Sequence, residues 1–192
     1  MVNLKQYYVH KKSTYQYQIT ASNYNLTIDS EVDITVQVID YAGDPVVGET
    51  VEVLKNNTSW QSGTTDSNGS FTLAYTCSEW GLVTFSANNA SIQVNVTGWR
   101  EITVGAGKLW VNNNTKTAVY YFTRTGAISS EISYANAIPV GYRPVSAVRT
   151  LAYNATGTNF KVIIEADGTV KLNGNSSSSI TVACEITYGY GV

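Results

Sequence analysis

Residues 137–144 read Ala-Ile-Pro-Val-Gly-Tyr-Arg-Pro and begin the stretch 137–172, around which the second half of the chain is organised. Pro139 and Pro144 each fix φ near −65° and push the preceding residue into extended geometry. Gly141 restores some of the freedom that the prolines remove. The segment is therefore predicted to be a stiff, non-helical crossing between strands.

Two alternating strands and a turn follow this crossing. Residues 145–153 alternate without either face being fully polar, which predicts a strand buried on both sides. Residues 160–164 carry the pattern into the next strand, the Asp167-Gly168 turn reverses the chain, and residues 170–172 return on the partner. We expect a β-hairpin that docks behind the rigid crossing.

Composition narrows the class of protein. The 192 residues carry a net charge of −2, only 14% of them are charged, and 14 are tyrosines. Such weak charge gives no basis for capturing nucleic acid or an anionic membrane surface, so neither is expected as a partner. A chain rich in Asn, Ser, Thr, Gly and Tyr is instead typical of an extracellular or virion β-protein. The length allows two small domains, each with its own core.

No targeting or membrane segment is predicted. The first residues lack an apolar core of signal-peptide length, and no later run approaches the ~18 apolar residues of a membrane span. Cys77 and Cys184 fall in different predicted domains, so a disulfide would require distant strands to meet. Cys184 alternates with Ile and Val residues, which favours a small buried hydrophobe.

The first domain follows a basic, aromatic stretch at residues 1–12, which we expect to be a connecting arm. From residue 13 to residue 97, about seven short strands separated by turn signals, with no helical period, predict an immunoglobulin-like sandwich. Turns are predicted at Gly43-Asp44 and at Asn68-Gly69. The residues expected to face inward include Tyr15, Tyr17, Ile19, Val32, Ile34, Val36, Val38, Val51, Val53, Phe71, Leu73, Tyr75, Val83, Phe85, Ile92, Val94 and Val96.

Three segments of this domain carry a resemblance to known proteins. Residues 43–48, residues 63–71 and Gly81 resemble the bacterial immunoglobulin-like and carboxypeptidase-regulatory-like modules of prokaryotic surface and phage proteins. The resemblance covers roughly residues 20–97. It implies that the domain acts as a spacer or stalk.

Gly98 and Trp99 mark a domain boundary, where Val-rich strands give way to Trp- and Asn-rich ones. About seven strands across residues 98–192 predict a second β-sandwich, a jelly-roll-like head. The predicted fold class is therefore all-β. It comprises an arm (1–12), an immunoglobulin-like domain (13–97) and a head (98–192).

The head carries an ordered set of motifs. Ile-Pro-x-Gly-Tyr-Arg-Pro at 138–144 precedes Asp-Gly-Thr-Val at 167–170, and further matches are at residues 98–99, 122–126, 145–149 and 186–188. With these motifs the head resembles the terminal domains of phage tail receptor-binding and baseplate proteins. The resemblance implies the tip of a homotrimeric fibre or baseplate appendage in the virion, which contacts other tail or baseplate proteins and binds a host cell-surface saccharide.

No catalytic constellation is predicted, and no cofactor is expected. The only histidine, His10, lies in the arm, and no Cys/His metal spacing or phosphate-binding loop is found in the sequence. Glu165 and Glu185 fall on outward positions, which fits a solvated face better than the acid/base pair of a glycosidase. Asp29, Glu31 and Asp33, near Asp40 and Asp44, could hold Ca²⁺ at a loop end, but a polar sheet surface is the preferred interpretation.

A saccharide site needs an aromatic face to stack on the sugar ring and a few polar groups to hold its hydroxyls. In the head, the candidates are Trp110, Tyr120, Tyr121, Arg124, Tyr142 and Arg143. For each aromatic residue, a place in the core is the competing interpretation. Arg143 and Arg149 have apolar neighbours, and we expect them to meet a carboxylate inside the head or across a subunit interface.

These observations lead to three hypotheses about function. The first is a non-enzymatic phage or prophage tail protein whose head binds a saccharide of the host envelope. The second is a prokaryotic cell-surface adhesin or carbohydrate-binding module. The third is a virion subunit with no receptor of its own. Saccharide binding by the head would separate the first two hypotheses from the third.

Overall fold

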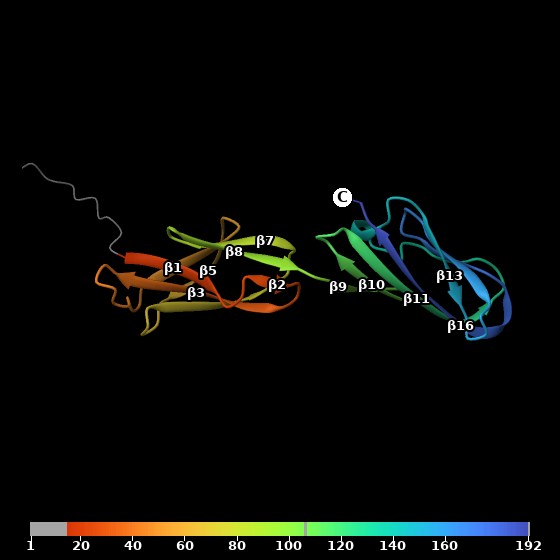
Figure 1. Cartoon of the computed structure of the whole chain (residues 1–192), viewed down its shortest axis with the longest axis horizontal. Coiled ribbons are helices and arrows are strands. Elements are labelled where there is room, and N and C mark those ends of the chain that lie inside the picture. Colours follow the sequence, from red (N-terminus) through yellow and green to blue (C-terminus); the bar gives the residue numbers. More distant parts are fainter. Residues whose placement is uncertain (1–14, 106, 192) are drawn as a thin grey trace, which may run out of the picture. The chain divides into compact units, whose positions relative to one another are not determined.

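The computed structural model describes residues 15–105 and 107–191, so the predicted arm at residues 1–12 lies outside the described part. Contacts divide the chain into two compact units, with the division between Val96 and Thr97 (Figure 1). Within the described residues the only helix is the 3₁₀ turn η1 (Val140–Tyr142), and no helix there has the length and apolar character to cross a membrane. The prediction of an all-β fold is confirmed.

The N-terminal unit is an immunoglobulin-like sandwich of two sheets. The first sheet has the order β1 (Tyr15–Ala21), β3 (Glu31–Asp40) and β6 (Ser70–Thr76). The second has the order β2 (Asn25–Thr27), β8 (Ala90–Thr97), β7 (Gly81–Ala87), β4 (Thr50–Lys55) and β5 (Thr58–Thr64). The sequence pattern predicts no strand at β2 or β5, because β2 is short, β5 is largely exposed, and both therefore show little alternation.

The core of this sandwich follows the period-two pattern of the sequence. Alternate residues of β3 are fully or almost fully buried, and residues of β4, β7 and β8 meet them from the opposite sheet. Each buried Val or Ile contributes about 1.5–3 kcal/mol through the hydrophobic effect. The rings of Trp60, Tyr75 and Phe85 close one part of the core, with centroids 5.0–5.7 Å apart. The predicted Gly43-Asp44 and Asn68-Gly69 turns are confirmed.

In the C-terminal unit, eight antiparallel strands form one sheet. Its order is β12 (Ile132–Tyr134), β15 (Val170–Asn173), β14 (Asn159–Ile164), β13 (Val148–Tyr153), β16 (Ser176–Gly189), β11 (Thr117–Ile128), β10 (Gly107–Asn112) and β9 (Arg100–Val104). Strands β11 and β16 are the longest pair and run side by side in Figure 1.

This sheet folds over on itself. Phe122 of β11 and Tyr134 of β12 stand five strands apart in the order, which in a flat sheet corresponds to about 24 Å. Their ring centroids are 5.9 Å apart. The two halves of the sheet therefore face each other as the two layers of a sandwich. Between them lie the fully buried side chains of Leu109, Tyr120, Phe122, Phe160, Ile164 and Leu172.

The proline-rich crossing docks on the turn between β14 and β15, as predicted. The Ile138 N–H donates to the Gly168 carbonyl at 3.0 Å, and the Arg143 Nε donates to the Ile138 carbonyl at 3.2 Å. Arg143, which precedes Pro144, is extended, with φ −73° and ψ 143°. The prediction of a wholly non-helical crossing is wrong at η1, because the Tyr142 N–H donates back to the Pro139 carbonyl at 2.9 Å and closes a 3₁₀ turn.

The prediction that residues 145–153 form a strand buried on both sides is also wrong. The strand β13 begins only at Val148, and one of its faces is open: Leu151 is 46% exposed and Tyr153 is 52% exposed. Ala152, on the other face, is fully buried. The reason is that the folded-over sheet covers only the inner face of β13, so its outward apolar residues have no layer above them within the unit.

Candidate functional site

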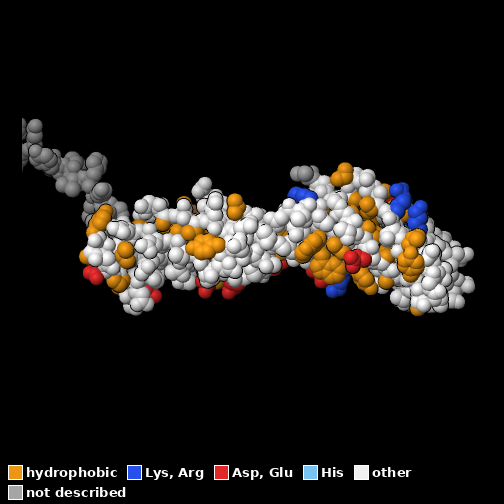
Figure 2. Space-filling view, viewed as in Figure 1, with side chains coloured by type: hydrophobic (Ala, Val, Ile, Leu, Met, Phe, Trp, Pro, Cys, Tyr) orange, Lys and Arg blue, Asp and Glu red, His pale blue; other side chains and the backbone are white. Residues whose placement is uncertain are grey.

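Two of the predicted ligand residues, Trp110 and Tyr121, meet on the outer face of the C-terminal unit. Trp110 lies opposite Val119 and Tyr121 lies opposite Lys108 in the β10–β11 pair. The two aromatic residues are thus diagonal neighbours, which places them about 7–8 Å apart along the sheet. Tyr121 is 39% exposed and Trp110 is half-buried. Figure 2 shows hydrophobic side chains gathered over this part of the unit, with acidic and basic ones beside them.

Charged side chains surround this aromatic pair. The Lys108 Nζ lies 3.0 Å from the Glu101 Oε1 and 5.7 Å from the centroid of the Trp110 ring. Glu185 of β16 lies opposite Tyr121 on the other side. An exposed ion pair and an exposed cation–π contact each contribute at most about 1 kcal/mol, so their effect on stability is small. They place hydrogen-bonding groups beside the Trp110 ring. We call Glu101, Lys108, Trp110, Tyr121 and Glu185 the outer platform.

The prediction that Tyr120 contacts a ligand is wrong. Because side chains alternate along β11, Tyr120 points inward when Tyr121 points outward, and its side chain is completely buried. Burial raises the pKa of its hydroxyl far above the usual 10, and the nearby Cys184 adds to this effect. The competing interpretation, a place in the core, is therefore the one that the structure supports for Tyr120.

Three other candidates lie apart from the outer platform. Arg124 points to the inner side of the sheet, where its Nη1 donates to the Tyr134 Oη at 3.1 Å. Arg143 donates from Nη2 to the Asn136 Oδ1 at 3.0 Å, in addition to its bond to the crossing. The ring of Tyr142 packs edge-on against Tyr190, with centroids 5.4 Å apart. These side chains stabilise the fold of the crossing and of the inner layer.

The two arginines expected to meet carboxylates differ in environment. The charge of Arg143 helps to lower the pKa of Asp167, although hydrogen bonds from Thr169 are the larger cause. Arg149 lies on the exposed face of β13, and the structure shows no ion pair for it among the described residues. A contact of either side chain with a neighbouring subunit stays a prediction.

No metal-binding group of three or more His, Cys, Asp or Glu residues occurs among the described residues. The Asp40 carboxylate instead accepts the N–H groups of Ala42 and Asp44 at 2.8 and 3.0 Å, which stabilises the turn after β3. Glu165 pairs with Lys171 at 3.2 Å. The two cysteines are free thiols: Cys77 is buried, and Cys184 is partly buried on the inner side of β16.

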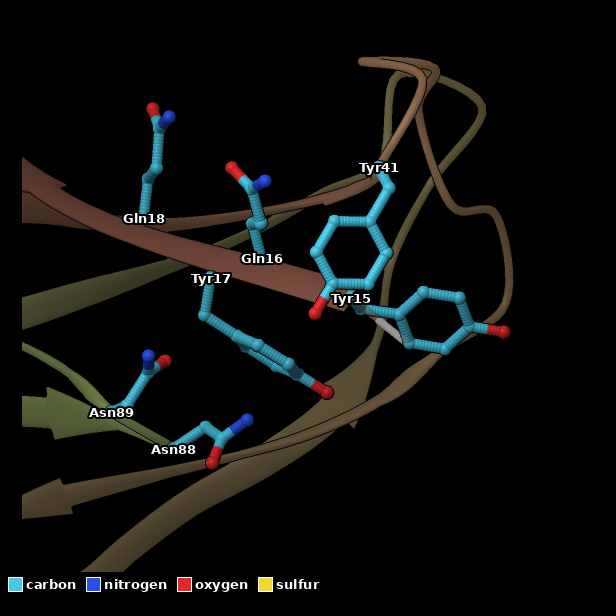
Figure 3. A pocket seen from close by; sticks show the side chains of 7 residues that line it. All are labelled: Tyr15, Gln16, Tyr17, Gln18, Tyr41, Asn88 and Asn89. Carbon is cyan, nitrogen blue, oxygen red and sulfur yellow. The ribbon is translucent and has the colours of Figure 1, made fainter. Parts of the chain in front are cut away.

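The N-terminal unit contains a hollow that the sequence analysis missed (Figure 3). Its volume is about 570 Å³, and it lies where β1, the loop after β3 and the turn between β7 and β8 approach one another. The sequence predicts one strand and two turns at these segments. The pattern of residues within each segment does not show that the three come together in the folded sandwich. The lining residues are Tyr15, Gln16, Tyr17, Gln18, Tyr41, Asn88 and Asn89.

Comparison with known proteins gives structural neighbours but no family. No protein-family model matches the chain, and no curated protein matches it. Solved structures that it resembles include invasin, a bacterial integrin-binding protein, with 12% identity over 91% of this chain and 39% of invasin, at a TM-score of 0.43. They also include the Yersinia pseudotuberculosis adhesin InvE, with 15% identity over 93% of this chain and 59% of InvE, at a TM-score of 0.36.

A third structural neighbour is the collagen adhesin of S. aureus, with 8% identity over 89% of this chain and 80% of that protein, at a TM-score of 0.27. All three neighbours are bacterial adhesins with β-rich folds. The chain spans less than two thirds of invasin and of InvE. Because each TM-score is below 0.5, these likenesses carry no argument about what this chain binds.

Proposed function

We propose that this chain is a non-enzymatic attachment protein that acts outside the cell and binds a saccharide with its outer platform. The observation that carries the proposal is the diagonal placement of Trp110 and Tyr121 on one exposed sheet face, with Lys108 and two carboxylates beside them. Tyr120, Arg124, Tyr142 and Arg143 have no part in the proposed site.

The chemistry of the outer platform suits a sugar ring. Aromatic rings offer an apolar face for the C–H side of a pyranose, and their polar edges tolerate water. The carboxylates of Glu101 and Glu185 accept hydrogen bonds from hydroxyls, and the Lys108 ammonium donates them. Because the side chains project from paired strands of one sheet, little order has to be gained on binding.

The class of protein that we propose first for this saccharide binding is a prokaryotic cell-surface adhesin or carbohydrate-binding module. An immunoglobulin-like sandwich preceding a β-sandwich with an exposed aromatic platform supports such an assignment. A phage tail receptor-binding protein is the second candidate. It is favoured by the close packing of its two most specific motifs, since the Ile138 N–H bonds directly to the Gly168 carbonyl.

Binding of the full chain to an array of glycans and of prokaryotic cell-wall polysaccharides tests this proposal. We expect at least one array ligand to bind the outer platform: its binding is lost when Trp110 and Tyr121 are both changed to Ala, and it is kept in Tyr24→Ala, which removes an exposed ring from the other unit. Cell-wall polysaccharides as the preferred ligands would favour the phage tail candidate, and glycans of other organisms would favour the adhesin. Absence of binding to every array member would refute the proposal.

A further inference from the structure

We infer that the N-terminal unit, which its sequence identifies only as a spacer, has a binding site for a neutral saccharide in the hollow beside β1. This inference is independent of the outer platform, because the hollow is built entirely from residues of the N-terminal unit. Its volume of about 570 Å³ falls within the roughly 300–1,000 Å³ that is usual for small-molecule sites.

The hollow lies beside β1, which among the described residues is an edge strand. Within that part of the chain, β1 is at the end of its sheet and pairs only with β3. The Ser22 N–H donates to the Asp33 carbonyl, so the backbone groups of Ser22 point toward β3. In an antiparallel pair this orientation repeats at every second residue, so the backbone groups of Gln18 also point toward β3. Tyr17 therefore turns its N–H and C=O toward the free edge. The Val38 N–H, opposite Tyr17, bonds to Gly69 instead, which agrees with this register.

The walls of the hollow are held in place by local hydrogen bonds. The Tyr17 hydroxyl donates to the Glu49 Oε1 at 3.1 Å, and the Glu49 N–H in turn donates to the Thr65 Oγ1 at 3.0 Å. The Asp40 carboxylate accepts the N–H groups of Ala42 and Asp44 and so stabilises the turn that carries Tyr41. A site whose groups are already in place loses less entropy when a ligand binds.

The two asparagines come from a tight turn. Ala87, the last residue of β7, pairs with Ala90, the first residue of β8, so Asn88 and Asn89 alone make the connection. Asn88 has a φ of 50°, a left-handed conformation that Asn tolerates better than most residues. Figure 3 shows the side chains of Asn88 and Asn89 on the same side of β1 as Tyr17, with Gln16 on the other side.

The lining favours a ligand that is neutral and rich in hydroxyl groups. None of the seven lining residues is charged. Burial, with a smaller effect of Glu49, raises the pKa of Tyr17, so its hydroxyl stays protonated at neutral pH. On the side of β1 that carries Tyr17, the carboxamides of Asn88 and Asn89 supply both donors and acceptors, as the vicinal hydroxyls of a sugar require, and the tyrosine ring supplies an apolar face. Among the residues that the structure describes, the lining offers no positive charge to a phosphate or a nucleic acid.

The lining residues have structural roles as well. Tyr15 and Tyr17 pack against the core, and the asparagines suit their turn. Tyr41 also lines the hollow and is 64% exposed, so much of its side chain is open to a ligand. An edge strand can also accept an extended peptide, and the test below separates this occupant from a saccharide.

The test uses the ¹⁵N-labelled full chain in which Trp110 and Tyr121 are both changed to Ala, so that the outer platform cannot contribute. Neutral malto-, cello- and chito-oligosaccharides are titrated in turn, and amide shifts are followed by NMR. We expect at least one of these probes to cause saturable shifts centred on Tyr17, Tyr41 and Asn89.

Variants of the lining then locate the site. In the same background, Tyr41→Ala and Asn89→Ala should each weaken binding about tenfold or more, which corresponds to 1.4 kcal/mol. Tyr153→Ala, which removes a similarly exposed ring from the other unit, should leave affinity unchanged. Unaltered affinity in folded Tyr41→Ala and Asn89→Ala, no saturable shift with any probe, or binding of an extended peptide alone would each overturn the inference. Because the background lacks the platform rings, failure here is separate from failure of the proposed function.

Discussion

Arg124 of β11 donates from Nη1 to the hydroxyl of Tyr134 in β12 at 3.1 Å, across five positions of strand order. Together with the ring contact between Phe122 and Tyr134, this bond joins the two layers of the folded-over sheet. The Arg124 Nε is buried and has no hydrogen-bond partner among the described residues. The guanidinium therefore depends strongly on the contact that Tyr134 provides.

Tyr134→Phe should destabilise the protein by about 1–2 kcal/mol, because a part-buried guanidinium loses its acceptor. The free energy of unfolding of the C-terminal unit, measured by urea denaturation, checks this value. Tyr188→Phe is the matched control. The Tyr188 hydroxyl is buried without a described hydrogen-bond partner, so its removal should leave stability equal or slightly higher. Equal losses in both variants would show that the bond between Arg124 and Tyr134 does not hold the layers together.

Gly168→Ala should be more damaging than Gly157→Ala, although both glycines have a positive φ, of +84° and +80°. At Gly157 a Cβ would enter open space, so the cost is the left-handed backbone alone, about 1–2 kcal/mol. At Gly168 a Cβ would stand 2.5 Å from the Ile138 carbonyl oxygen and 2.6 Å from the Arg143 Nε. Overpacking of this kind adds about 1–3 kcal/mol. Thermal unfolding of the two variants in parallel measures the difference, and similar melting temperatures would contradict the docking of the crossing on this turn.

Cys184 should react slowly with iodoacetamide in the native protein. Burial raises the pKa of its thiol from 9.0 to about 11, which lowers the thiolate fraction at pH 8 by about a hundredfold. Cys77→Ala leaves Cys184 as the single thiol, so mass spectrometry can follow its alkylation between pH 8 and pH 11. Since the folded pKa is the higher one, the stability that this thiol contributes is present below pH 9 and lost as the pH rises toward 11. Native alkylation as fast as in urea would contradict this environment.

The chain should assemble into a homotrimer, as the resemblance of the head implies. Val140 and Val145 beside the crossing are each 76% exposed, and such apolar side chains become more favourable when a neighbouring subunit covers them. Light scattering at micromolar concentration measures the mass. A stable monomer would remove the prediction, and a trimer that dissociates when both valines are changed to Asp would assign the contact to this surface.

How far the sequence determines this fold depends on the range of the interactions. Period-two alternation predicts β3 and β8 well, because each has one buried and one exposed face. The Asp167-Gly168 turn could also be predicted, since its chemistry is local. Burial of both faces of β13 was a wrong prediction, because whether a second layer covers a strand depends on the closure of the whole sheet.

The candidate site was only partly predictable for the same reason. The alternation of side chains along a strand predicts that Trp110 and Leu109 point to opposite faces of the sheet. It predicts the same for Tyr120 and Tyr121. It cannot show that Trp110 and Tyr121 become diagonal neighbours, because that depends on the register between β10 and β11. The hollow beside β1 was not predicted, because Tyr41 and Asn89 approach Tyr17 only in the folded sandwich.

The most direct test of the proposed function is a titration of the full chain with the saccharide that binds best in the array, followed through the indole N–H resonance of Trp110. We predict a saturable shift of this resonance, and a loss of affinity at the platform of at least about tenfold in Tyr121→Ala, with no change in Tyr24→Ala. Binding of that saccharide with the Trp110 resonance unmoved, and with equal affinity in the Tyr121→Ala variant, would contradict the assignment of attachment to the outer platform.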